Sequence, residues 1–104
     1  MLKAKHTFSP AGKLRLFRQG KALLEQAIGQ EDNIELRYLR FGVQSKAPAF
    51  LGYNGQIQQD KTFLIAQLQE GSIADKELYG LIKTFLLQSA YCSAAEKTLL
   101  NSLP

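Results

Sequence analysis

The fold is decided by the stretch Ile34-Glu-Leu-Arg-Tyr-Leu-Arg-Phe-Gly-Val-Gln44. At about 100° per residue, its apolar side chains project from a helix in two nearly opposite directions. The first group is Ile34, Tyr38 and Phe41, and the second is Leu36, Leu39 and Val43. A helix with two apolar faces packs between two neighbours, because each face has to be covered. The stretch therefore predicts the central helix of a layered, all-α arrangement.

A narrow polar stripe separates the two apolar faces and consists of Arg37, Arg40 and Gln44. Two guanidinium groups at positions i and i+3 of a helix can together hold a carboxylate or the C-terminus of a peptide. The stripe is therefore a candidate partner-binding site. In the alternative interpretation it faces water, or pairs with Glu35 or Asp60, and has no binding role.

Further helices are predicted on both sides of this stretch. Ser9-Pro10 is a helix start, since proline at the first helical position loses no hydrogen bond. Asp32 and Glu35 have capping-box spacing, and so do Ser93 and Glu96. Gly71 is placed to end a helix in the left-handed conformation. The expected helices cover residues 10–28, 33–44, 56–70, a segment that starts at Ser72 or Asp75, and 93–103.

No segment alternates polar and apolar residues over more than a few positions, so no strand is expected. The prediction is an all-α fold, a compact array of four or five helices. The chain has 104 residues, which is enough for a single core. We therefore expect one helical domain over residues 1–104, in which residues 1–8 form a loose N-terminal tail.

The scarcity of reactive side chains argues against catalysis. Cys92 and His6 are the only residues of their types, so neither a disulfide framework nor a zinc cluster can be built within the chain. Acid–base and nucleophilic catalysis need several convergent polar groups, and no such motif or phosphate-binding loop is present. We expect no enzyme activity, no catalytic residues, no metal and no cofactor.

No apolar run reaches the length of about 18 to 20 residues that a membrane span requires. The N-terminus also lacks the apolar segment of a secretory signal. The sequence leaves the compartment open: the chain as given fits the cytoplasm, and it fits the envelope or medium if a signal has been removed.

Positive charge is concentrated near the N-terminus, where six cations precede the first acidic residue, Glu25. Arg15, Arg18 and Lys21 fall on the polar side of the first expected helix, opposite an apolar arc that includes Leu16 and Leu23. This basic face gives an alternative function, binding of nucleic acid or of an acidic surface. Three cations on one helix are also ordinary solvent-facing residues.

The segment Pro48–Gly55 combines turn-forming residues with the large side chains of Phe50 and Tyr53. If these aromatic rings are exposed, they mark an interface with a partner. If they fold inward, they plug the open end of the helical array. Both interpretations remain open from the sequence, and the second is favoured.

Small and large residues between Gly20 and Gly42 alternate in a recognisable pattern. The pattern consists of Gly20, Leu24, Ala27 and Ile28, then Asp32-Asn33, then Tyr38-x2-Phe41-Gly42. It resembles the junction between two units of the tetratricopeptide repeat family. The longer run from Ile34 to Phe41, with the Pro48–Tyr53 segment after it, is similar to uncharacterised bacterial proteins.

The resemblance implies tetratricopeptide-like antiparallel helix packing and a non-enzymatic protein-interaction or assembly module of bacterial origin. Such a module would bind a protein or peptide partner through Arg37, Arg40, Gln44, Phe50 and Tyr53. A homodimer is also expected, because repeat units generally need about three repeats, or a capping partner, to close their core.

Overall fold

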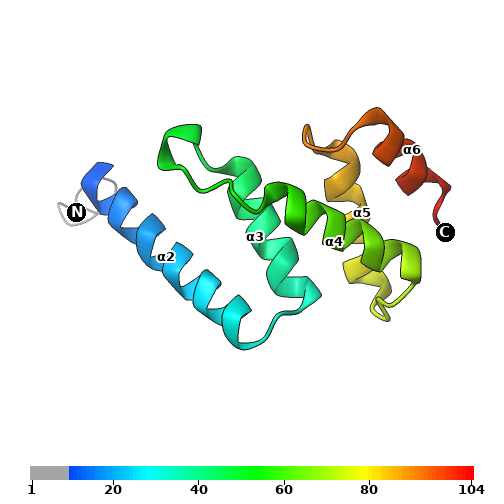
Figure 1. Ribbon diagram of the computed structural model, residues 1–104, viewed down its shortest axis with the longest axis horizontal. Helices are drawn as coiled ribbons and strands as arrows, with labels where there is room; N and C mark the ends of the chain where they lie inside the picture. The colour runs from blue at the N-terminus through cyan, green and yellow to red at the C-terminus, as the bar shows by residue number, and fades with distance from the viewer. Residues whose placement is uncertain (1–9) are drawn as a thin grey trace, which may run out of the picture. The chain divides into compact units, whose positions relative to one another are not determined.

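The computed structural model describes residues 10–104, which form five α-helices and one short 3-10 helix but no strand. This confirms the all-α prediction for the described part of the chain (Figure 1). The expected tail over residues 1–8 and the Ser9 cap lie outside the described residues. The elements are α2 (Pro10–Gln30), α3 (Ile34–Lys46), η1 (Ala49–Leu51), α4 (Ile57–Glu70), α5 (Lys76–Gln88) and α6 (Ala94–Ser102).

The chain divides after Asn33 into two compact units. Helix α2 belongs to the first unit, and residues Ile34–Pro104, with helices α3 to α6, form the second. Within α2, two leucines of the predicted apolar arc, Leu16 and Leu23, are exposed. The expectation of a single domain over residues 1–104 stays a prediction.

The helix ends follow local signals in the sequence. Gly71 ends α4 with φ 68°, the left-handed conformation that glycine adopts without a steric penalty. Asp75 caps α5 by accepting hydrogen bonds from the N–H groups of Glu77 and Leu78. The capping box of α6 is complete, since Ser93 and Glu96 each bind the backbone N–H of the other. Of the two predicted starts of α5, Ser72 and Asp75, the structure has Asp75, and the predicted start of α6 at Ser93 is confirmed.

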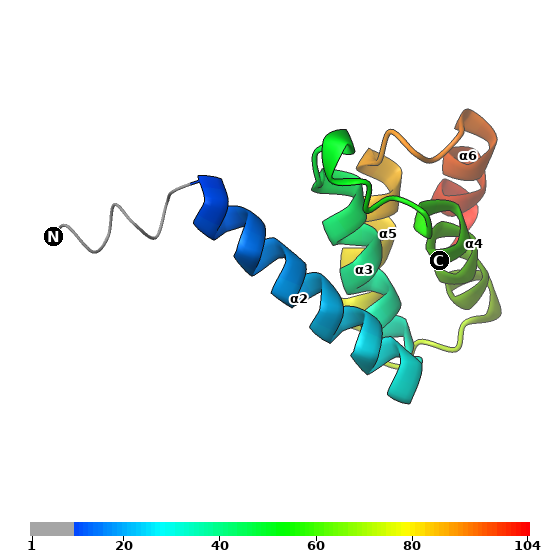
Figure 2. The same cartoon turned by 60° about the vertical axis from the view of Figure 1, so that its left-hand side comes forward.

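Helices α3 to α6 of the second unit run in alternating directions, and each contacts the next (Figures 1 and 2). Their shared core contains five side chains with no solvent exposure, namely Phe41, Leu64, Ile82, Leu86 and Leu100. The ring of Phe85 adds edge-on contacts with Tyr38 and Phe41, whose centroids are 5.8 and 5.7 Å away. Helix α3 therefore contacts both α4 and α5.

The two apolar faces predicted for α3 have different environments. Phe41 belongs to the core of the second unit, and Ile34 and Tyr38 pack against that core. The other group lies outside the core cluster, and Leu39 there is 53% exposed. One of the two faces of α3 is thus covered by α4 and α5.

Candidate functional site

The polar stripe of α3 is joined to α4 by one carboxylate. Asp60 has no solvent exposure, and Arg40 binds it with two hydrogen bonds, from Nε to Oδ2 at 2.7 Å and from Nη2 to Oδ1 at 2.8 Å. Arg37 Nη1 donates to the same Oδ1 at 2.9 Å, and its guanidinium lies 4.9 Å from the ring centroid of Phe63. The pairing of the stripe with Asp60, which the sequence allows as an alternative to a binding role, is therefore present in the structure. A partner-binding role for these arginines stays a prediction.

Gln44, the third residue of the stripe, closes the loop between α3 and α4. Its side chain is buried, accepts the backbone N–H of Gln56 at 3.2 Å, and donates to Gln56 Oε1 at 2.7 Å. This pair of hydrogen bonds joins the last turn of α3 to the residue that precedes α4. The loop that contains η1 is therefore held at both of its ends.

Within this loop the two aromatic candidates point to different environments. Tyr53 is only 4% exposed and is buried in the second unit, whereas Phe50 is 87% exposed. Gly52 separates them with φ 68°, and its N–H donates to the carbonyl of Ala49. Tyr53 matches the plug interpretation and Phe50 the interface interpretation. The loop thus has a buried anchor and an exposed aromatic side chain only three residues apart.

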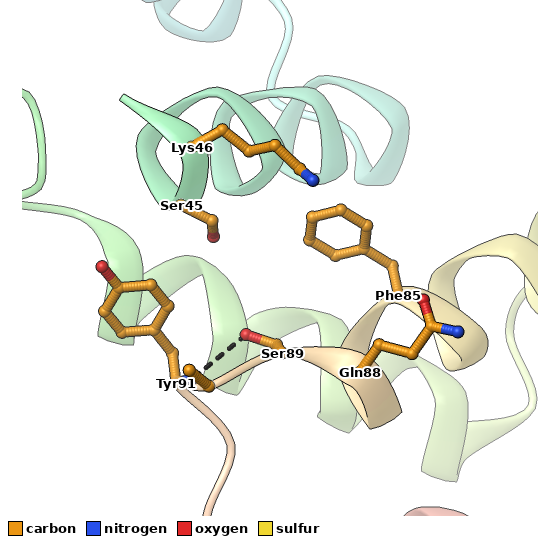
Figure 3. A pocket seen from close by; sticks show the side chains of 7 residues that line it. Ser45, Lys46, Phe85, Gln88, Ser89 and Tyr91 are labelled. Atoms are coloured by element: carbon orange, nitrogen blue, oxygen red, sulfur yellow. Dashed lines mark hydrogen bonds between the residues drawn. The ribbon is translucent and has the colours of Figure 1, made fainter. Parts of the chain in front are cut away.

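A cavity of about 450 Å³ opens where α3 and α5 end (Figure 3). The ends of α3 and α5, where this cavity opens, and the loop between α3 and α4 lie at the same end of the second unit, as the ribbon shows (Figures 1 and 2). At the edge of the cavity, the ammonium group of Lys46 lies 5.9 Å from the ring centroid of Phe85. The cavity is lined by Ser45, Lys46, Phe85, Gln88, Ser89, Ala90 and Tyr91.

We call this surface the aromatic end and define it as the solvent-facing parts of residues 45–59 and 84–95. These 27 residues include a single charged side chain, Lys46, although 21% of the whole chain is charged. Sequence reasoning missed Lys46, Ser89 and Tyr91. The scarcity of charge in both segments was a visible signal, but it did not show that the two segments meet.

Lys61 and Glu96 hold the loop that carries Tyr91. The buried ammonium group of Lys61 donates to the carbonyl oxygen of Tyr91 and to Glu96 Oε1, each at 3.0 Å. The backbone N–H of Ser93 and then the ammonium of Lys61 donate hydrogen bonds to Glu96, which lowers the pKa of its carboxyl group. The backbone at Tyr91 is therefore held to α4 by a buried cation.

The lowered pKa of Glu96 predicts a pH dependence of stability. A carboxylate with a depressed pKa in the folded state stabilises the fold above its ordinary value of 4.5. This stabilisation is lost as the pH falls from 4.5 through the folded-state pKa. We expect Glu96→Gln to lower the free energy of unfolding near neutral pH, and the difference from wild type to shrink as the pH falls below 4.5. Urea unfolding at a series of pH values tests this, and a pH-independent difference would contradict it.

Cys92 is a buried side chain of the core rather than a reactive thiol. Burial, followed by the nearby charge of Glu96, raises the pKa of its thiol group, which keeps it protonated. We expect a thiol reagent to modify the native protein about a hundredfold more slowly than the urea-unfolded chain. Modification of the native protein at the rate of the unfolded chain would show that Cys92 is accessible.

On α2, Arg15 and Arg18 are exposed and Lys21 is half-buried. The alternative that this basic face binds nucleic acid predicts an affinity for DNA or RNA that falls steeply with salt concentration. Replacing Arg15 and Arg18 with Gln would weaken such binding. Titrations of DNA and of RNA at two salt concentrations test this alternative. An affinity that changes neither with salt nor with the two substitutions would contradict it.

Among residues 10–104, no helix is both long and apolar enough to cross a membrane. The same residues contain no group of three or more His, Cys, Asp and Glu side chains that could hold a metal ion. Comparisons with models of protein families, with curated proteins and with solved structures found no match. The tetratricopeptide resemblance and the bacterial origin therefore stay predictions, and the site is interpreted from its own geometry.

Proposed function

We propose that this protein is a non-enzymatic protein-interaction module that binds a segment of a partner protein at the aromatic end. The observation that carries the proposal is the exposure of Phe50, 87%, on a loop with restrained ends. Burying an aromatic ring of this size upon binding stabilises a complex by about 2 kcal/mol. An exposed Phe50 contributes nothing comparable to the folding of the isolated chain.

The way in which Phe50 is held also supports a binding role. The hydrogen bonds of Gln44 with Gln56 and the buried ring of Tyr53 restrain the loop on both sides of η1. A restrained loop loses less conformational entropy when it binds than a flexible loop does. Phe50 is thus presented for contact at a low entropic cost.

The composition of the aromatic end is typical of the centre of an interface. Interface centres are depleted in charged residues and enriched in aromatic ones, and a few aromatic side chains supply most of the binding energy. Phe50 and the 42% exposed Tyr91 are the candidates for that role. Lys46 is the one charged residue of the surface.

Selection of binding peptides from a random library displayed on phage tests the proposal without knowledge of the natural partner. We expect selection on the wild-type protein to enrich peptides that no longer bind Phe50→Ser. Leu81→Gln is the matched control, because Leu81 is another exposed apolar residue, on α5, and lies outside the aromatic end. Unfolding of each variant in urea establishes that both fold as the wild type does.

Two results would contradict the proposal: a selection that enriches no peptide, and enriched peptides that bind Phe50→Ser as tightly as wild type. Light scattering of the same samples measures the expected homodimer separately. A dimer that Phe50→Ser dissociates would identify a second copy of the chain as one occupant of the aromatic end.

A further inference from the structure

The cavity of the aromatic end has a positively charged side chain on its lining. Lys46 is the only charged residue on its lining and is exposed at its edge (Figure 3). The nearby Lys61 and Glu96 form an ion pair with each other, so their charges compensate. A single ammonium group at the edge of an otherwise uncharged cavity favours a ligand with negative charge.

The C-terminal ends of α3 and α5 at this cavity disfavour an anion, since the C-terminus of a helix has a partial charge of about −0.5. At this site several terminal carbonyl groups are already hydrogen-bonded. The carbonyl of Val43 accepts the N–H of Ala47 at 2.9 Å, and that of Leu86 accepts the N–H of Ser89 at 3.1 Å. These hydrogen bonds reduce the partial negative charge that the two helix ends present to the cavity, so the full charge of Lys46 outweighs it and an anion is favoured.

Hydrogen-bond donors and apolar surface lie side by side in the cavity. The buried hydroxyl oxygen of Ser89 accepts the N–H of Tyr91 at 3.1 Å, which leaves its own O–H able to donate. The exposed amide of Gln88 is a second donor on the lining. The rings of Phe85 and Tyr91 supply apolar contacts on the same lining. This combination suits a carboxylate with an apolar group next to it.

We propose that the cavity binds an acidic side chain of the partner segment, paired with Lys46, while an adjacent apolar side chain packs on Phe85 and Tyr91. This inference rests on the proposed function and specifies its partner, a segment in which Asp or Glu stands next to an apolar residue. Lys46 determines the sign of the charge that is accepted, and Ser89 and Gln88 donate hydrogen bonds to the carboxylate. Phe50 contacts another part of the same segment.

Three dipeptides, each acetylated and amidated so that the termini carry no charge, test this inference in NMR titrations of the isotope-labelled protein. They are phenylalanyl-glutamate, phenylalanyl-glutamine and phenylalanyl-lysine. We expect the glutamate peptide to shift the signals of Lys46, Ser89 and Tyr91, and to bind about three- to fivefold more tightly than the glutamine peptide, the ratio that one partly exposed ion pair provides. Added salt should reduce this ratio.

Substitution of Lys46 isolates the ion pair. Lys46→Gln should abolish the preference for the glutamate peptide, whereas Lys76→Gln should keep it. Lys76 is the matched control, because it is also an exposed lysine. It stands at the start of α5, whereas the cavity lies at the C-terminal end of that helix. Neither substitution removes a buried side chain, so both variants should remain folded.

The inference is wrong if the lysine peptide binds most tightly, if no peptide shifts the signals of the cavity, or if Lys46→Gln keeps the preference. Its failure differs from a failure of the proposed function. If the inference fails but binding of the library peptides still depends on Phe50, the proposed function stands and only the assignment of a carboxylate ligand is wrong. Library peptides that bind Phe50→Ser normally would overturn the proposed function itself.

Discussion

Asp60→Asn should lower the free energy of unfolding by about 3 to 5 kcal/mol, the usual cost of removing one partner from a buried ion pair. The Asp60 carboxylate has no solvent exposure and accepts three hydrogen bonds, two from Arg40 and one from Arg37. In the variant, a neutral amide would face these guanidinium groups. The buried Arg40 would then lose the charge of Asp60 without regaining water.

Urea unfolding followed by circular dichroism measures this loss. Glu70→Gln is the matched control, because it makes the same change of charge on an exposed residue of α4 and should alter stability by less than about 0.5 kcal/mol. If Asp60→Asn is too unstable to show a folded baseline, its lost helical signal in the absence of urea supports the prediction equally. A loss below about 1 kcal/mol would show that the buried pair contributes little to the packing of α3 on α4.

Lys61→Met should destabilise the protein by about 2 kcal/mol, the second-largest effect we expect, since it removes both hydrogen bonds of a buried charged group. Methionine keeps most of the apolar length of lysine but donates no hydrogen bond. The Tyr91 carbonyl and the Glu96 carboxylate would each lose a donor that now lies 3.0 Å away. The loop between α5 and α6 would therefore lose its link to α4.

A double-mutant cycle with Glu96→Gln separates the ion pair from the rest of the effect. We expect the two substitutions together to cost less than the sum of their separate costs, because both remove the same contact. Lys76→Met, at an exposed position, should have little effect on stability. Strict additivity of Lys61→Met and Glu96→Gln would show that their 3.0 Å contact contributes nothing to stability.

Local signals predicted the helices well because each one acts within a few residues. Pro10, Gly71, Asp75 and Ser93 stand at helix ends where the sequence placed them. Their effects depend on a missing backbone donor, on a positive φ angle or on a side chain that binds its own backbone. None of these requires knowledge of a distant part of the chain.

The site was harder to predict, since it depends on segments that are far apart in the sequence. Phe50 and Tyr53 look alike in the sequence, and only the 3-10 turn with the positive φ of Gly52 sends one outward and the other inward. The cavity joins residues around Lys46 to residues around Ser89, about forty positions later. Helix periodicity contains no information on which helix ends meet.

The most direct test of the interaction proposal is the affinity of one library-selected peptide for the wild-type protein and for Phe50→Ala, measured by fluorescence anisotropy. Phe50 is 87% exposed, so its replacement should leave the free energy of unfolding nearly unchanged. We predict that the dissociation constant rises about tenfold or more, as expected when a central aromatic residue is removed from an interface. An affinity within about twofold of wild type, in a stably folded Phe50→Ala, would contradict the assignment of the aromatic end as the binding surface.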